Sequence, residues 1–316
     1  MDETDEAIVE LLQRDGRLPH SEIAAAIGLS RSAAASRLQR LLSSGRVEVR
    51  GVVHPAVLGL HQMTHVMLTV EGDAAVVADR MAGRDDTAFV SLVTGPAAVA
   101  VELRCDSLQA VDRAVAELRG EPGVRGVEGL LYFEVVHDVV GPVGLVPDEV
   151  AEVDDTDLGL LAALQEDGRA SYVTLARRVG LSAPGARRRV LALERDGLVK
   201  VGALVRQSGD EHQAMTGLGL KLAGDSRPVI DLLDGLSQVT FVARTLGRHD
   251  LLVELRARTG AELVGAMSVI RQAPLVRSVD SWTHLRVVKE TYARARPRVP
   301  GTTDTGTGTG TGKGTR

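Results

Sequence analysis

Residues 28–45 read GLSRSAAASRLQRLLSSG and contain a tight turn, a capped helix and a glycine stop. Ser30 is a favourable N-cap, because its hydroxyl can accept a hydrogen bond from a free amide of the first helical turn. Gly45 stands where a helix end favours a residue that tolerates positive φ. One side of this helix carries apolar residues at helical spacing, namely Ala34, Leu38 and Leu41. Together with a short helix over residues 21–27, the stretch predicts a helix-turn-helix.

The opposite side of the same helix is small and polar, with arginines around it. Short polar side chains on the front of a helix suit base edges in the DNA major groove, and flanking guanidinium groups suit phosphates. The pattern therefore predicts a helix that binds double-stranded DNA. The residues that we expect to contact DNA are Ser30, Arg31, Ser32, Ser36, Arg37, Gln39 and Arg40.

The stretch occurs a second time, as GLSAPGARRRV at residues 180–190. The same offset of 152 residues relates Asp15-Gly16-Arg17 to Asp167-Gly168-Arg169 and, far downstream, Glu102 to Glu254, with no gap. Internal repeats of this length are a primary signal of architecture. The chain is therefore predicted to be a direct duplication of one unit.

The second copy of the helix differs from the first in its arginine content. The residues expected to contact DNA here are Ser182, Arg187, Arg188 and Arg189. Clustered guanidinium groups favour phosphate contacts, whereas Ser36 and Gln39 of the first copy favour base edges. Arg37 and Arg189 have an alternative interpretation, in which each packs on the flank of its helix or touches phosphate instead of reading a base.

The composition is that of an ordinary globular chain, with 316 residues, 44% of them hydrophobic and 25% charged. The net charge of −5 argues against a generally basic nucleic-acid coat but permits a local basic site. No apolar run is long enough for a membrane span, and the acidic N-terminus does not resemble a secretory signal. The single cysteine, Cys105, permits no intramolecular disulfide. We therefore expect a cytoplasmic protein with no membrane partner.

From residue 65 onward the apolar pattern alternates between strands and helices. The expected segments are a strand over 65–71, a helix over 73–81, strands over 88–94 and 98–104, a helix over 107–118 and a long strand over 124–136. This βαββαβ order predicts a ferredoxin-like sheet with two helices on one face. The uncovered face favours a partner sheet. We therefore expect the two copies to form a pseudo-dimer within one chain.

The expected fold class is α+β, a gapless tandem repeat in which each of two winged helix-turn-helix domains precedes a ferredoxin-like βαββαβ domain. Residues 47–53 alternate like the short hairpin that forms a wing. The expected boundaries are 1–53 and 154–206 for the winged helices, 54–64 and 207–216 for the connectors, 65–138 and 217–292 for the ferredoxin-like domains, 139–153 for the linker and 293–316 for a disordered tail.

The helix-turn-helix residues resemble the signature of the Lrp/AsnC (feast/famine) family of transcriptional regulators. The resemblance is carried by Asp5, Leu12, Asp15-Gly16-Arg17, Ile23-Ala24, Gly28-Leu29-Ser30, Arg37-Leu38, Leu41 and Gly45. The βαββαβ unit resembles that family's ACT-like regulatory (RAM) domain. The resemblance implies a sequence-specific DNA-binding regulator and not an enzyme, with no cofactor, a small-molecule effector that is commonly an amino acid, and higher assembly, here a homo-oligomer of pseudo-dimeric chains.

The resemblance also places an effector pocket at the turn between the second and third strands of the regulatory domain. The family's Gly-x-x-Asp pattern is present in the second copy at residues 247–250, whereas residues 95–98 of the first copy have lost the acid. The expected effector-binding residues are Gly247, Arg248, His249, Asp250, Ser281 and Thr283. The alternative interpretation of Asp250 is that it only caps a β-turn.

Two other functions remain open at this point. The tandem architecture also resembles fused sirohaem decarboxylases, but their His-x-Tyr-Asn type of motif is missing from residues 95–100 and 247–252. A co-regulator that does not itself bind DNA is the second alternative. No metal is expected at His249 and His284, because no paired cysteine or carboxylate spacing accompanies them. None is expected at His61 and His65 either, because they lie on a connector that enters a strand.

Overall fold

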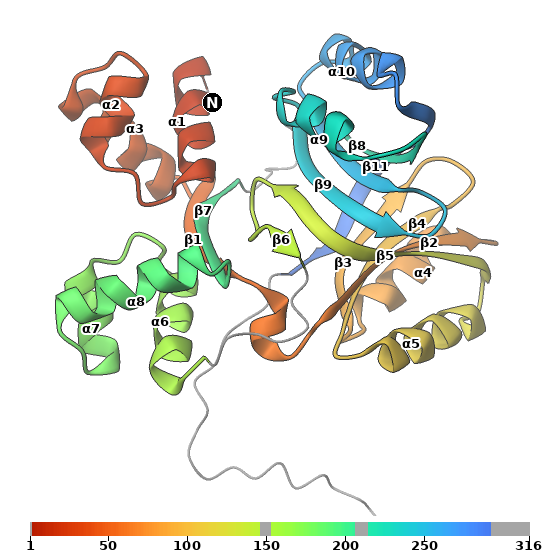
Figure 1. Ribbon diagram of the computed structural model, residues 1–316, viewed down its shortest axis with the longest axis horizontal. Coiled ribbons are helices and arrows are strands. Elements are labelled where there is room, and N and C mark those ends of the chain that lie inside the picture. Colours follow the sequence, from red (N-terminus) through yellow and green to blue (C-terminus); the bar gives the residue numbers. More distant parts are fainter. Residues whose placement is uncertain (1, 146–152, 206–213, 292–316) are drawn as a thin grey trace, which may run out of the picture.

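The computed structural model describes residues 2–145, 153–205 and 214–291. The helix-turn-helix units lie on one side of the molecule and a large sheet with its covering helices lies on the other (Figure 1). The expected disordered tail, residues 207–213 of the polar connector and residues 146–152 of the linker lie outside the described residues.

Each helix-turn-helix unit contains three helices followed by one strand, and the two units are built alike. The bounds in the first unit are α1 Glu3–Arg14, α2 His20–Ala26, α3 Arg31–Ser43 and β1 Val47–Val53. The bounds in the second unit are α6 Asp155–Glu166, α7 Tyr172–Val179, α8 Ala183–Arg195 and β7 Val199–Val205. Reciprocal capping boxes start α1 at Asp2 and α6 at Asp154, because each cap carboxylate accepts an amide that the helix leaves unpaired. The two copies therefore share even the details of their helix caps.

The expected wing at residues 47–53 is wrong as a local hairpin. These residues form the single strand β1, which pairs antiparallel with β7 of the other unit over its whole length, from Val47 opposite Val205 to Val53 opposite Val199. In addition, α1 packs on β7 and α6 packs on β1. In a wing, the apolar residues of this strand would turn inward within one unit. Here they are buried between the two units, which therefore share one hydrophobic core.

The two regulatory units have the expected βαββαβ order. Their strands are β2 Gln62–Val70, β3 Thr87–Val93, β4 Val99–Cys105 and β5 Val124–Asp138 in the first, and β8 Ala214–Leu222, β9 Val239–Leu246, β10 Leu251–Ala257 and β11 Val276–Glu290 in the second. Their helices are α4 Ala74–Ala82, α5 Leu108–Gly120, α9 Arg227–Asp234 and α10 Gly260–Gln272. The first strand begins at Gln62, inside the expected connector, which also holds the short 3-10 helix η1 Pro55–Leu58.

Within each unit the strands have the ferredoxin-like order, β5-β2-β4-β3 and β11-β8-β10-β9. The units join edge to edge, because β3 pairs with β11 and β9 pairs with β5. These pairings close a ring of strands with the four helices on its outside (Figure 1). The expected linker also contributes a short strand, β6 Gly144–Leu145, which pairs with the end of β5. The intramolecular pseudo-dimer is therefore present.

Each regulatory unit buries an apolar core between its sheet and its own helices. A third core lies inside the ring and contains side chains from both units, including Met63, Leu130 and Tyr132 from the first and Leu252 and Trp282 from the second. Burial of this apolar surface is the main term that holds the two regulatory units together.

Candidate nucleic-acid interface and effector site

The second helix of each helix-turn-helix pair is fixed by the same turn. Gly28 precedes α3 with a φ of 67° and Gly180 precedes α8 with a φ of 71°, a conformation that glycine adopts without strain. The Ser30 hydroxyl accepts from the amide of Ala33 and the Ser182 hydroxyl accepts from the amide of Gly185, each at 3.2 Å. Ser30 and Ser182 therefore act as N-caps in the structure.

A second shared feature holds Arg37 and Arg189 away from the expected DNA face. The Arg37 guanidinium donates to the carboxylates of Asp2 at 2.6 Å and Asp5 at 2.9 Å, and the Arg189 guanidinium makes the same pair with Asp154 and Asp157 at 2.7 and 2.9 Å. These contacts raise the pKa of both arginines. Both side chains tie the second helix of the motif to the capping box of α1 or α6, as the packing interpretation of these residues expects.

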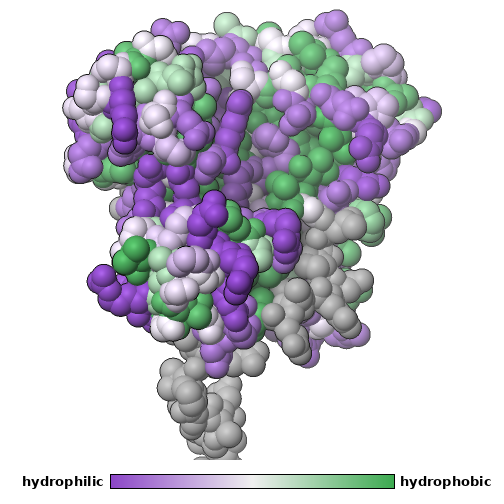
Figure 2. All heavy atoms as spheres, turned by 60° about the vertical axis from the view of Figure 1, so that its left-hand side comes forward, coloured by the Kyte–Doolittle hydropathy of each residue, from purple (hydrophilic) through white to green (hydrophobic). Residues whose placement is uncertain are grey.

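The remaining expected DNA contacts lie on an outward stripe of each helix. On α3 the exposed residues are Arg31, Ser32, Ser36, Gln39, Arg40 and Ser43. On α8 the residues at the offset of 152 along the same stripe, Pro184, Arg188, Leu191 and Arg195, are also exposed, and Arg187 lies beside them. In Figure 2 hydrophilic side chains cover much of the face that the two units present.

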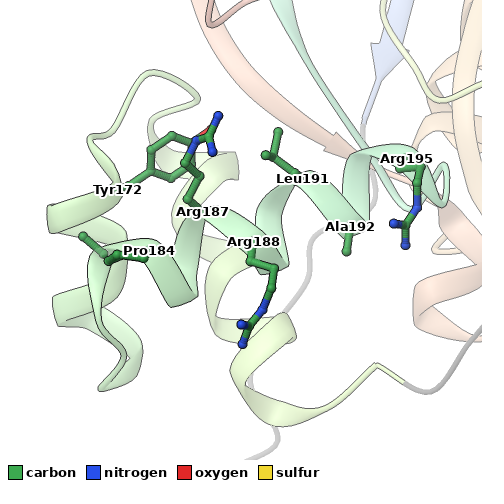
Figure 3. Close-up of a pocket in the computed structure, with 8 residues that line it drawn as sticks. Tyr172, Pro184, Arg187, Arg188, Leu191, Ala192 and Arg195 are labelled. Atoms are coloured by element: carbon green, nitrogen blue, oxygen red, sulfur yellow. The ribbon is translucent and has the colours of Figure 1, made fainter.

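The stripe on α8 borders a groove of about 740 Å³. The groove is lined by Tyr172, Ala183, Pro184, Arg187, Arg188, Leu191, Ala192 and Arg195. Figure 3 shows Arg187 beside the Tyr172 ring, and Arg188 and Arg195 projecting from the helix. The groove thus combines cationic groups with apolar and aromatic surface, whereas the α3 residues that match Pro184, Arg188, Leu191 and Arg195 carry hydroxyl and amide groups.

The two helix-turn-helix units are locked together by a reciprocal pair of arginines. Arg17 donates to the carbonyl oxygens of Gly168 and Ala170 at 2.5 and 2.8 Å, and Arg169 donates to those of Gly16 and Leu18 at 2.6 and 3.1 Å. Arg17 also lies over the Tyr172 ring, 4.6 Å from its centroid. Burial lowers the pKa of Arg169. The sequence shows these arginines as a repeated residue, which aligns the copies and, for Arg17, belongs to the family signature; their locking role was not predicted.

Contacts also connect the helix-turn-helix units to the regulatory units. Glu6 on α1 forms an ion pair with Arg258, which precedes α10. Lys200 on β7 donates to the carbonyl oxygen of Asp138 at the end of β5. Each helix-turn-helix unit therefore contacts the regulatory unit of the opposite copy.

The expected effector residues lie near the junctions between the two regulatory units, with the turn at 247–250 next to β5 and Thr283 next to β3. A Cβ on Gly247 would lie 2.8 Å from the Leu130 side chain, so this turn packs closely on the other unit. Arg248 pairs with Asp280 at 2.8 Å and with Glu128 of the first unit at 3.3 Å. Asp280 therefore faces this junction, although sequence reasoning did not single it out.

The side chain of Asp250 points to its own unit. It accepts from the backbone amide of Leu222 at 2.7 Å and lies 3.4 Å from the Lys221 ammonium. The buried His249 instead bonds Asp280 at 2.9 Å. Ser281 is exposed, and Thr283 is held through its backbone by the hydroxyl of Thr94. The structure thus brings Arg248 and His249 together at Asp280, whereas the Asp250 carboxylate is directed to Leu222 and Lys221.

Inside the ring lies a polar cluster that the sequence did not predict. His65 stacks on Trp282 with a centroid distance of 5.7 Å, and the His284 imidazole lies 3.3 Å from the Glu254 carboxylate. Burial lowers the pKa of His65 to about 4. The sequence feature that accompanies this stack is Gly217. A Cβ at this position would lie 2.3 Å from the indole of Trp282, so the glycine makes room for the ring.

Within residues 2–145, 153–205 and 214–291, no group of three or more potential ligands is placed to hold a metal ion. In the same ranges no helix is long and apolar enough to cross a membrane.

Comparison with known proteins gives the same division of the chain. The model of the AsnC-type helix-turn-helix domain matches residues 1–42 and 153–194. The HTH-type transcriptional regulator FL11 of Pyrococcus furiosus is 27% identical over 137 residues, which are 43% of this chain and 91% of that protein. An HTH-type transcriptional regulator of Pyrococcus abyssi is 30% identical over 148 residues, 43% of this chain and 93% of that protein. These relatives match about one copy of the duplication.

A solved structure matches nearly the whole chain. The crystal structure of the siroheme decarboxylase NirDL superimposes with a TM-score of 0.63 and 14% identity, and the match covers 92% of this chain and 94% of that one. At this identity the match shows a common fold.

Proposed function

The chain belongs to the Lrp/AsnC family of helix-turn-helix transcriptional regulators, and we propose that one chain binds operator DNA with both of its helix-turn-helix units at once. The observation that carries this proposal is the pairing of two equally built units through β1 and β7, with an outward stripe on α3 and another on α8. Helix-turn-helix dimers place their second helices in the major groove at half-sites about one helical turn, 10 base pairs, apart. Here the duplication supplies both halves of such a dimer.

The electrostatics support a local interaction with phosphates. The chain has a net charge of −5, but the exposed side chains of α3 and α8 include five arginines: Arg31, Arg40, Arg187, Arg188 and Arg195. Contacts of arginine with phosphate release counterions, so the affinity should fall steeply with salt.

The test is selection of bound sequences from random duplex DNA by the full-length protein, followed by fluorescence anisotropy on the selected duplex. Gln39→Ala should weaken binding to that duplex more than to an unrelated one, because an amide on the front of α3 meets a base edge. Arg113→Ala, an exposed arginine on α5 of the regulatory unit, is the matched control and should bind like the wild type. Failure to enrich any sequence would leave the co-regulator as the remaining function.

We further propose that an amino acid binds at the junction around residues 247–250. Arg248 offers a guanidinium for the α-carboxylate, and the carboxylates of Asp280 and Asp250 are the candidates for the α-ammonium group. Gly247 and His249 belong to the same turn, and Ser281 and Thr283, which follow Asp280 on β11, are further candidates. Calorimetry against the twenty amino acids tests it, with Arg248→Ala and Asp250→Asn as variants and Arg119→Ala on α5 as the control.

Loss of one charge-assisted hydrogen bond costs about 1.5–3 kcal/mol, so Arg248→Ala should weaken amino-acid binding about tenfold or more. Asp250→Asn tests which of the two carboxylates binds the ammonium group, because the Asp250 carboxylate already accepts a hydrogen bond from the amide of Leu222. Unchanged affinity in this variant would assign the ammonium to Asp280. Absence of heat with every amino acid would count against this effector class and leave the DNA-binding proposal standing.

The shared fold with a siroheme decarboxylase is no reason to propose the same reaction, because fold alone does not carry function. The turns at 95–100 and 247–252 contain no Tyr-Asn pair. Incubation of the protein with sirohaem, followed by absorbance and product analysis, should show no conversion.

A homo-oligomer of pseudo-dimeric chains is the proposed assembly. Large apolar side chains are exposed on α10 at Val264, which is 67% exposed, and on β11 at Leu285, which is 65% exposed. Such surface favours association with further copies. Light scattering of the full chain tests this, and a monomeric mass at micromolar concentration would contradict it.

A further inference from the structure

The two outward stripes occupy equivalent places on one scaffold but carry different chemistry. Residues Ser32, Ser36, Gln39 and Ser43 of α3 correspond, at the offset of 152, to Pro184, Arg188, Leu191 and Arg195 of α8. All eight are exposed. Both helices are set by the same N-cap bond of 3.2 Å and by the same arginine tie to an acidic capping box. The divergence therefore concerns the surface that faces outward and not the framework that positions it.

From this we infer that the protein recognises an operator with two unlike half-sites, one read by Ser36 and Gln39 and the other by Arg188 and Leu191. The inference rests on the proposed DNA-binding function. A dimer with identical subunits mirrors its two-fold symmetry in a palindromic operator. A pseudo-symmetric chain with different side chains at equivalent positions meets equivalent base pairs with different groups, so the palindrome is broken.

The chemistry of the side chains predicts which bases each half-site prefers. The Gln39 amide matches the donor and acceptor pair of adenine in the major groove. At the equivalent place the exposed Leu191 offers only apolar contact, for which the thymine methyl group is the partner. The Arg188 guanidinium, at the place of Ser36, matches the two acceptors of guanine. The half-site of α8 should therefore be fixed for guanine and thymine at positions where the half-site of α3 prefers adenine or tolerates several bases.

The geometry also divides the arginines of α8 into two roles. Arg188 shares its stripe with Leu191 and Pro184, so it faces the groove floor when the helix lies in the major groove. Arg187 corresponds to Ala35, lies beside Tyr172 and flanks the stripe (Figure 3). Phosphate contact, which the sequence favours for both arginines, is therefore assigned to Arg187, and base reading is assigned to Arg188.

A reciprocal exchange of side chains tests the inference with the full-length protein. The double variant Arg188→Ser with Leu191→Gln gives α8 the two residues of α3, and Ser36→Arg with Gln39→Leu does the converse. The probes are three duplexes of the same length: the selected operator with half-sites a and b, and the two palindromes a–a and b–b. The wild type should bind a–b at least about tenfold more tightly than either palindrome, since one wrong base pair already costs about that factor.

The first double variant should then prefer a–a and the converse variant b–b, each by about tenfold or more. Arg187→Ala should weaken binding to all three duplexes alike and reduce the salt slope by about one, as loss of a phosphate contact does. Thermal unfolding of each variant shows that the fold is retained. Arg113→Ser on α5 is the control for the loss of one positive charge.

The outcomes separate the inference from the function on which it rests. If the wild type enriches no DNA sequence, DNA binding itself fails. If the wild type binds DNA but its selected operator is a palindrome, or if the exchanges leave the preference for a–b intact, the unlike-half-site assignment is overturned.

Discussion

Acidification should destabilise this protein through a histidine that is buried where the two regulatory units meet. His65 is 3% exposed, inside the ring of strands, and stacks on Trp282. Its pKa is lowered to about 4, chiefly by burial and further by the charges of His284 and His249, while Glu254 opposes the shift. In the unfolded chain the same imidazole has a pKa of about 6.5. Between these two values the unfolded state holds a proton that the folded state lacks.

The sign follows from proton linkage. Stability rises with pH wherever the unfolded state binds more protons, so the stabilisation present at pH 7 is lost as the pH falls through 6.5 towards 4. The slope for one proton is about 1.4 kcal/mol per pH unit. A change from pH 7 to pH 5 therefore costs about 2 kcal/mol at His65. His54, whose pKa burial also lowers to about 4, adds a loss of the same sign and size.

The assay is urea unfolding at pH 7 and pH 5 at constant ionic strength. His65→Gln removes the titrating group and keeps a polar side chain, so this variant should lose about 2 kcal/mol less than the wild type between the two pH values. His20→Gln is the control, because His20 is exposed on α2. If the wild type and His65→Gln lose the same free energy of unfolding, the buried neutral state of His65 is refuted.

Three further predictions concern the framework. Gly217→Ala should destabilise the fold by about 1–3 kcal/mol in urea unfolding, because its Cβ would lie 2.3 Å from the Trp282 indole. The control Gly265→Ala, on α10, should stabilise the fold by about 0.5–1 kcal/mol, because nothing lies within 4 Å of its Cβ. Arg17→Ala removes two charged hydrogen bonds between the helix-turn-helix units and should cost about 2 kcal/mol or more and weaken DNA binding; unchanged affinity and melting temperature would contradict the locking role. A fragment of residues 1–140 should self-associate in light scattering, because β1, β3 and β5 lose their partners in the second copy; a stable monomer would oppose this.

Much of the fold could be predicted from the sequence, because the signals were local. The cap at Ser30, the glycines at 28 and 180 and the period of the apolar residues depend on neighbouring residues only. The exact offset of 152 residues then predicted the pseudo-dimer without any knowledge of contacts. What local signals could not give was the partner of each strand. The alternation at 47–53 is the same for a hairpin and for a strand paired with another unit, so the wing was expected where β1 meets β7.

The candidate site shows the same division. The exposed faces of α3 and α8 followed from helical spacing, because the side opposite an apolar stripe faces solvent. The role of Arg37 did not, because its partners Asp2 and Asp5 lie on another helix. The contacts of the acid at the effector turn could not be predicted for a related reason. Sequence gives the position of Asp250 but not the direction of its side chain, which depends on the amide of Leu222, 28 residues away.

Covalent fusion of the two copies explains why framework and functional surfaces diverged differently. In a homodimer every substitution appears in both subunits. A substitution where the subunits meet must therefore pack against a partner that carries the same substitution. In the fused chain, His65 lies opposite Leu130 on one pair of strands and Gly217 lies opposite Trp282 on the other. The stack of His65 on Trp282 needs one residue from each pair, and neither copy could form it with itself. The arginine locks stayed alike because each serves both units, whereas the ring interior and the outward stripes were free to differ.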